Sequence, residues 1–310
     1  MQVEKDGLHE RLAAGRFVVT AEITPPVTSD PMALLERARG LKGLAIAVNV
    51  TDGAGAKVHL SSLVAAHLLR QNGIEPILQM TCRDRNRLAL QGDLLGAAAL
   101  GIRNVLALSG DDPKQGDQPE TKPVNDLDSR GLLAMAEGMR REHRLPSGTA
   151  ISGPLDFFLG AADLPVDPPT DWAPRGLIAK LDAGARFVQT QFCMDVAVIR
   201  RYAQRLRDLG LAERAAFLIG VAPIPSPRSA HWMRRHLFGT IIPDAIIARL
   251  EGAADPKREG RDICVELLQQ LAETPGIAGA HVMAPQNPAA IPEVIALSRV
   301  TEANSEGRQR

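Results

Sequence analysis

Short apolar segments rich in β-branched residues recur along the chain, and a stretch with helical spacing of apolar residues follows each of them. The first two segments, residues 17–23 and 44–50, lack the strict alternation of a strand with one solvated face. Segments that are apolar on both faces are typical of parallel strands covered by helices on each side. The pattern therefore predicts alternating β-strands and α-helices.

Eight strand–helix pairs follow one another. The predicted strands are residues 17–23, 44–50, 75–80, 104–109, 156–162, 185–192, 215–222 and 278–283. The predicted helices are residues 30–42, with Asp30 as cap, then 60–71, 86–100, 128–141, 175–183, 196–209, helical stretches within 229–271, and 289–298. Eight units close naturally into a barrel, whereas an open doubly wound sheet usually has fewer strands. We predict one α/β domain over residues 1–310, a (β/α)8 TIM barrel, with short polar ends at 1–15 and 300–310.

Composition and charge narrow the class of partner. Lysine plus arginine and aspartate plus glutamate number 36 each, so no net field attracts nucleic acid or an anionic membrane. The charged N-terminal residues resemble no signal peptide, and no run approaches the ~20 apolar residues of a membrane span. Three cysteines without metal-ligand spacing fit a reducing cytosol and predict no metal site. We expect a cytoplasmic protein with a small-molecule ligand.

Polar side chains gather where the predicted strands end. The C-terminal ends of the strands and the loops after them form the active face of such a barrel. Glu22 ends the first strand, Gln79 the third and Gln191 the sixth, while SGDDP (residues 109–113) follows the fourth. The loop that begins there has no apolar periodicity until about residue 127, and loops of this length are more often functional than passive.

Each polar residue also has a plain structural interpretation. Glu22 would pair with a neighbouring arginine, Asp111 would form a turn or cap a helix, and Gln191 would be a buried, satisfied amide. Six of the seven histidines, at positions 59, 67, 143, 231, 236 and 281, share no common spacing. The joint placement of the polar residues at one end of the barrel, rather than any single residue, favours an active site.

Five motifs occur in a fixed order between residues 17 and 298: AEITPP, VTDG, QMTC, ALSGD and DAGARFVQTQFCMD. In order and position they resemble the methylenetetrahydrofolate reductase family in its short bacterial form. The resemblance implies an oxidoreductase of one-carbon metabolism and methionine biosynthesis that reduces 5,10-methylenetetrahydrofolate to 5-methyltetrahydrofolate. It further implies a flavoprotein with FAD as cofactor and NADH or NADPH as electron donor; FMN or no flavin at all are the alternatives.

The resemblance also implies roles for individual residues. Glu22 would be the general acid, and Asp111 would lie beside both the flavin and the pterin. Substrate contacts are expected from Gln191, Asp111 and Gln79, and cofactor contacts from Thr51, Asp111, Lys180, Ser109 and Asp163. The lysine would lie near the flavin phosphates. Gln79, Ser109 and Asp163 stand where relatives have histidine, arginine and tyrosine.

Two other functions fit the same residues. A non-redox pterin or one-carbon transferase would hold the pterin through the paired aspartates of SGDDP and would transfer no hydride. A partner-dependent reductase would take its electrons from another protein instead of a nicotinamide. A homo-oligomer is expected because members of the family usually form one.

Overall fold

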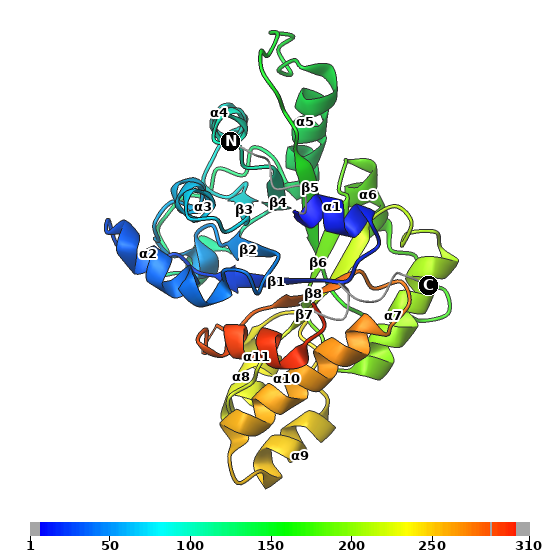
Figure 1. Ribbon diagram of the computed structural model, residues 1–310. Coiled ribbons are helices and arrows are strands. Elements are labelled where there is room, and N and C mark those ends of the chain that lie inside the picture. Colours follow the sequence, from blue (N-terminus) through cyan, green and yellow to red (C-terminus); the bar gives the residue numbers. More distant parts are fainter. Residues whose placement is uncertain (1–6, 286, 302–310) are drawn as a thin grey trace.

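The computed structural model describes residues 7–285 and 287–301, and its centre is a closed barrel of parallel strands in chain order. The strands are β1 (Val18–Ile23), β2 (Ala47–Val50), β3 (Pro76–Thr81), β4 (Asn104–Leu108), β5 (Phe158–Asp163), β6 (Phe187–Phe192), β7 (Ala216–Val221) and β8 (Gly279–Val282). β8 pairs with β1 and closes the ring. Figure 1 shows the strands at the centre with the helices around them. The predicted eight-stranded TIM barrel is confirmed.

Helices follow every strand, close to the predicted positions. They are α2 (Pro31–Ala38), α3 (Ser62–Gln71), α4 (Arg87–Ala99), α5 (Ser129–Glu142), α6 (Arg175–Asp182), α7 (Val196–Asp208), α8 (Pro227–His236), α9 (Asp244–Gly252), α10 (Pro256–Ala272) and α11 (Ala290–Ser298). Asp30 caps α2 by accepting a hydrogen bond from the Met32 amide, as expected. The predicted helical stretches within 229–271 correspond to α8, α9 and α10. Proline opens α8 and α10 and directly precedes α9, because its ring is tolerated only in a first turn.

One further helix, α1 (Leu8–Ala13), lies within the part of the chain expected to be a polar end. Leu8 is fully buried in an interior cluster with Val18, Ala47, Ile77, Leu106, Phe158, Phe187 and Leu218. These residues come from seven strands, so the helix covers the N-terminal end of the barrel, as Figure 1 shows. The remainder of the expected ends, residues 1–6 and 302–310, lies outside the described residues.

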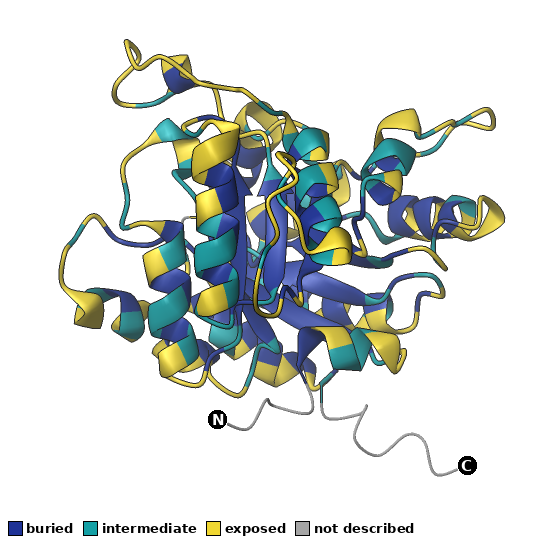
Figure 2. Cartoon of the chain, turned by 90° about the horizontal axis from the view of Figure 1, so that it is seen from above, coloured by how far each residue is buried: buried dark blue, intermediate teal, exposed yellow. Residues whose placement is uncertain are grey.

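A second, larger apolar cluster fills the space between the barrel and its surrounding helices. Figure 2 shows the strands as the buried centre and the exposed residues on the outer sides of the helices and in the loops. Among the described residues, no helix is both long and apolar enough to cross a lipid bilayer. Since apolar side chains occupy the space around the strands, we expect ligand-binding residues at the strand ends and in the loops that follow them.

Candidate active site

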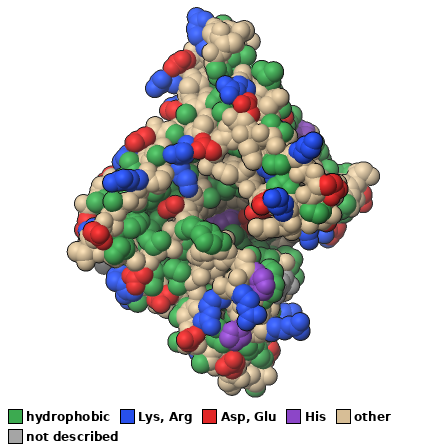
Figure 3. Space-filling model, turned by 180° about the vertical axis from the view of Figure 1, so that it is seen from behind, with side chains coloured by type: hydrophobic (Ala, Val, Ile, Leu, Met, Phe, Trp, Pro, Cys, Tyr) green, Lys and Arg blue, Asp and Glu red, His purple; other side chains and the backbone are tan. Residues whose placement is uncertain are grey.

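The C-terminal end of the barrel is hollowed and lined by polar side chains. Val18 belongs to the interior cluster, so alternation along β1 also directs Thr20 and Glu22 into the barrel. Figure 3 views this end and shows a depression over the barrel axis with a histidine at its floor. Glu22, Gln79, Asp111 and Gln191 lie at the ends of β1, β3 and β6 or in the loop after β4, and thus on one rim of the barrel.

Glu22 is held by an amide and faces a histidine. Its side chain is 22% exposed, and Gln79 Nε2 donates a hydrogen bond of 2.8 Å to Glu22 Oε2. His281 Nε2, on β8, lies 3.7 Å from the same oxygen. The described contacts of Glu22 include no arginine or lysine, so the ion pair considered as its plain interpretation is not present among them. The carboxyl group is therefore partly accessible, and no arginine or lysine among its described contacts pairs with it.

Asp111 lies in the exposed loop after β4 and ties that loop to the loop after β2. Its Oδ2 accepts a hydrogen bond of 2.7 Å from the Gly55 amide. The buried guanidinium of Arg83 donates to the carbonyl oxygens of Gly53 and Asp111, at 3.2 and 3.4 Å. Asp111 Oδ1 accepts no hydrogen bond from the described residues. One carboxylate oxygen is thus structural, and the other is available for a ligand.

Two further predicted residues, Gln191 and Thr51, have polar atoms that form few hydrogen bonds with the rest of the described chain. Gln191 is half-buried, and its Oε1 accepts a hydrogen bond of 3.0 Å from the Phe192 amide, which leaves its amide nitrogen for a ligand. The Thr51 hydroxyl is buried, and within the described part of the chain it has no hydrogen-bond partner. Buried polar atoms without partners are uncommon in native proteins and often mark a ligand position. Ser109, by contrast, is simply exposed.

Lys180 and Asp163 form a local pair instead of a free cationic site. Lys180 Nζ donates to the Ala162 carbonyl at 2.6 Å and lies 3.8 Å from Asp163 Oδ1. Tyr202 donates its hydroxyl to Asp163 Oδ2 at 3.3 Å. Burial raises the pKa of the Asp163 carboxyl, and the charge of Lys180 opposes this rise. The predicted phosphate-binding lysine is therefore already engaged by its neighbours.

The three cysteines are all buried, as expected for isolated thiols. Burial raises the pKa of Cys82 to about 11 and that of Cys193 to about 12, and it raises the pKa of Cys264 as well. A thiol acts as a nucleophile in its thiolate form, which these values suppress at neutral pH. None of the three is suited to covalent catalysis.

Two groups of residues at this end of the barrel were not among the predicted site residues. The first is a buried polar layer below Glu22, made of Thr20, Asn49, Gln189 and His281. The second is the pair of Arg85 and Asp52, in which Asp52 also accepts hydrogen bonds from the amide and hydroxyl of Thr81. The signal for the first group was present: polar residues recur at every second position of otherwise apolar strands, in phase with Glu22.

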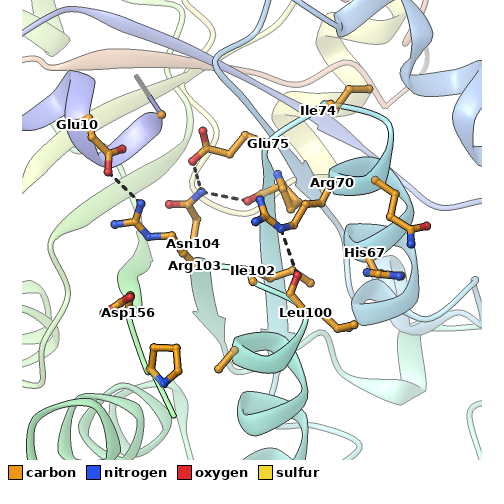
Figure 4. Close-up of a pocket in the computed structure, with 17 residues that line it drawn as sticks. Glu10, His67, Arg70, Ile74, Glu75, Leu100, Ile102, Arg103, Asn104 and Asp156 are labelled. Carbon is orange, nitrogen blue, oxygen red and sulfur yellow. Dashed lines mark hydrogen bonds and ion pairs between the residues drawn. The ribbon is translucent and has the colours of Figure 1, made fainter. Parts of the chain in front are cut away.

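Cavities occur at both ends of the barrel. One of about 620 Å³ opens at the N-terminal end, and Figure 4 shows it lined by Glu10, Arg103, Asn104 and Glu75, which belong to the ends opposite the predicted site. Another of about 290 Å³ lies among the loops after β2, β3 and β4 and includes Lys57, His59 and Arg83. Within residues 7–285 and 287–301 no group of three or more His, Cys, Asp or Glu side chains is arranged to hold a metal ion.

The chain matches a family model and several curated relatives that are described as methylenetetrahydrofolate reductases. The family model of methylenetetrahydrofolate reductase matches residues 7–298. The chain is 28% identical over 296 residues to 5,10-methylenetetrahydrofolate reductase of Pectobacterium carotovorum subsp. carotovorum, a match that covers 90% of this chain and 89% of that protein. It is 26% identical over 308 residues to the probable methylenetetrahydrofolate reductase (NADPH) of Caenorhabditis elegans, covering 93% of this chain but only 44% of the longer relative.

A solved structure supports the fold independently. An uncharacterized protein from Clostridium thermocellum, described as binding two copies of 5-methyl-5,6,7,8-tetrahydrofolic acid, superimposes with a TM-score of 0.62 at 15% identity and covers 95% of this chain and 99% of its own. At this identity the likeness concerns the barrel alone. The match to the family model extends over nearly the whole chain and includes the strands that carry Glu22, Gln79 and Gln191 and the loop that carries Asp111. The chain belongs to the methylenetetrahydrofolate reductase family.

Proposed function

We propose that this chain reduces 5,10-methylenetetrahydrofolate to 5-methyltetrahydrofolate with a hydride from a reduced nicotinamide. Family membership supports the reaction. The observation that carries the proposal for this chain is the state of Glu22: a partly exposed carboxyl group at the active end of the barrel, bonded by an amide and contacted by no described arginine or lysine. Such a group can carry a proton and deliver it to a ligand.

The substrate's chemistry explains why an acid is needed. A methylene carbon bridges N5 and N10 of the folate, and hydride cannot add to it until the five-membered ring opens. A proton from Glu22 to N10 makes that nitrogen a leaving group, the C–N10 bond breaks, and a cationic iminium forms at N5. Hydride then adds to the methylene carbon and gives the N5-methyl product, while the nicotinamide becomes oxidised. Glu22 is reprotonated from solvent.

Asp111 and Gln191 are proposed to hold the pterin and the developing charge. The free Oδ1 of Asp111 would accept a pterin N–H and stabilise the iminium by its negative charge. The amide nitrogen of Gln191 would donate to the folate, since its oxygen is already bonded within β6. Gln79 orients Glu22 and lies at the same rim.

Flavin is typical of the family, and FAD is what the sequence resemblance implies. The unpartnered Thr51 hydroxyl suits a ligand contact. Of the other expected cofactor residues, the single cation is Lys180, which is engaged by Ala162 and Asp163. Lys180 as it stands therefore offers the FAD diphosphate no free cation. The alternatives are FMN as the flavin, or direct hydride transfer from NADH or NADPH without a flavin.

Two measurements on the purified chain test the proposal. Incubation with 5,10-methylenetetrahydrofolate and NADH or NADPH should oxidise the nicotinamide and yield an equal amount of 5-methyltetrahydrofolate, which mass spectrometry detects. An absorption spectrum taken before the assay distinguishes a bound flavin from direct transfer. Product formed only with a protein electron donor would indicate the partner-dependent reductase. Turnover of the folate without any electron donor would indicate the transferase and contradict the proposal.

A further inference from the structure

A layer of buried polar side chains crosses the barrel interior one step below Glu22. Thr20, Asn49, Gln189 and His281 are at most 3% exposed and come from β1, β2, β6 and β8. Branched apolar residues usually fill such a layer. Polar groups there cost free energy unless they are bonded to one another. The hydrogen bonds among these four side chains therefore show how each of them is oriented.

The amides of Asn49 and Gln189 bond each other in both directions. Asn49 Nδ2 donates to Gln189 Oε1 at 2.7 Å, and Gln189 Nε2 donates to Asn49 Oδ1 at 3.0 Å. In this orientation of the two amides, Gln189 Nε2 points toward Thr20 and His281. The second N–H of that nitrogen faces Thr20 Oγ1 at 3.1 Å and His281 Nδ1 at 3.3 Å.

The same contacts select one protonation form of His281. The Thr20 hydroxyl lies 2.9 Å from His281 Nδ1 and 3.4 Å from the Ala280 carbonyl oxygen, so the ring nitrogen is its nearer acceptor. Because the Gln189 N–H donates to Thr20 Oγ1, the Thr20 hydroxyl hydrogen is directed at Nδ1, which we assign as its acceptor. The ring hydrogen then resides on Nε2, on the side of Glu22.

Both N–H groups that reach Glu22 point at one of its two oxygens. Gln79 Nε2 donates to Oε2 at 2.8 Å, and His281 Nε2 lies 3.7 Å from that same Oε2. Oε1 accepts no hydrogen bond from the described residues. Because Oε2 accepts the hydrogen bond from Gln79, a protonated Glu22 would carry its hydrogen on Oε1, where it would not meet that donor.

We propose that His281 is a positioning residue of the reductase site: held as the neutral Nε2–H form by Thr20 and Gln189, it reserves Oε2 of Glu22 as an acceptor and leaves Oε1 to carry the proton that is transferred. The inference rests on the proposed function of Glu22 as acid. A doubly protonated ring would instead hold Glu22 as a carboxylate in an ion pair and remove the acid. The Thr20 hydroxyl directed at Nδ1 opposes a hydrogen on that nitrogen. Among the described contacts of His281, Glu22 is the one ionisable partner.

Nuclear magnetic resonance of the full chain labelled with ¹⁵N-histidine tests the form of the ring without any assay. The His281 signals, identified by their loss in His281→Gln, should show a protonated Nε2 and an unprotonated Nδ1 at neutral pH. Thr20→Val keeps the side-chain shape and removes one donor, so the form protonated at Nδ1 should gain population. A ring in the wild type that carries its hydrogen on Nδ1, or on both nitrogens, overturns the proposal.

Kinetics test whether that form matters. His281→Leu should lower kcat about 10-fold or more with little change in KM, because a loss of orientation acts on the chemical step. His281→Gln, which retains an N–H donor, should recover most of the rate, and His231→Leu on the exposed side of α8 should behave as wild type. Equal rates for wild type and a folded His281→Leu would overturn the positioning role. A wild type that reduces no folate would instead refute the proposed function, and the ring spectrum would still decide the form of His281.

Discussion

Positions inside the barrel differ in how much side-chain volume they accept. Gly160, on β5, faces Phe187 on the neighbouring strand, and a Cβ atom at Gly160 would lie 2.2 Å from the ring. Phe187 is fully buried and cannot swing away. The aromatic ring thus takes the space that a side chain at position 160 would need.

Gly160→Ala should therefore destabilise the protein by about 1–3 kcal/mol, the usual cost of overpacking a core. Gly138→Ala is the matched control, because a Cβ at that position in α5 meets nothing within 4 Å and alanine is the better helix former. Urea denaturation measures both. Equal unfolding midpoints for the two variants would contradict the packing described for β5.

Individual side-chain contacts were the part of the site that the sequence could not predict. The motif positions of Glu22 and Gln79 follow from the chain, but their 2.8 Å bond joins strands that are not neighbours in the barrel and depends on its tilt and closure. The engagement of Lys180 by Asp163 depends in the same way on a helix packed against β5. The alternation of residues along β8 predicts that the His281 side chain points into the barrel, but the sequence does not predict which side chains it contacts.

At the scale of elements, capping residues set where the helices begin. Asp128 precedes α5, and its Oδ1 accepts a hydrogen bond of 2.7 Å from the Gly131 amide. This bond lowers the pKa of the Asp128 carboxyl. A lowered pKa in the folded state means that the ionised cap stabilises the fold above the unfolded pKa of about 3.9, and that this stabilisation is lost as the pH falls through the lower folded value.

Asp128→Ala should cost about 1 kcal/mol of unfolding free energy at neutral pH. The difference from wild type should shrink as the pH falls below about 4, because the unfolded chain binds its proton there, and it should disappear once the pH passes the lower pKa of the folded cap. Ser129→Ala, one residue later, is the control and should change little. A difference that stays constant down to the acid transition would show that the charge of the cap does not contribute.

Most elements could be predicted from the hydrophobic pattern, because parallel strands covered on both sides appear as short apolar runs. The pattern failed where periodicity is too short or too continuous. The six residues of α1 hold a single fully buried residue, Leu8, and within 229–271 the pattern predicted helical stretches but not the bounds of the three helices. Pro227, Pro243 and Pro256 were the available signals for those bounds.

At the scale of the whole molecule, the two ends of the barrel differ in how they are packed. The N-terminal end is closed by Leu8 of α1 against side chains from seven strands, and the C-terminal end is open and polar. Because the N-terminal end is packed with apolar side chains, the barrel stays stable while its C-terminal end carries partly buried polar groups. The homo-oligomer expected from the resemblance stays a prediction.

Leu8→Ala should destabilise the protein by about 2–5 kcal/mol, since it removes a fully buried side chain and leaves a cavity at the barrel end. Leu12→Ala in the same helix should cost less, because that residue is only partly buried. Chemical denaturation compares the two variants. A loss below about 1 kcal/mol for Leu8→Ala would mean that α1 does not close the barrel.

The kinetics of Glu22→Gln test the central claim, that a single acid at the open end of the barrel enables reduction of the folate. The amide keeps the shape of the side chain but has no acidic proton. Folate reduction should fall by about 10²- to 10⁴-fold, the usual contribution of a general acid. The Kd for 5-methyltetrahydrofolate should stay within a few-fold of the wild-type value. An unchanged kcat in Glu22→Gln would contradict the account.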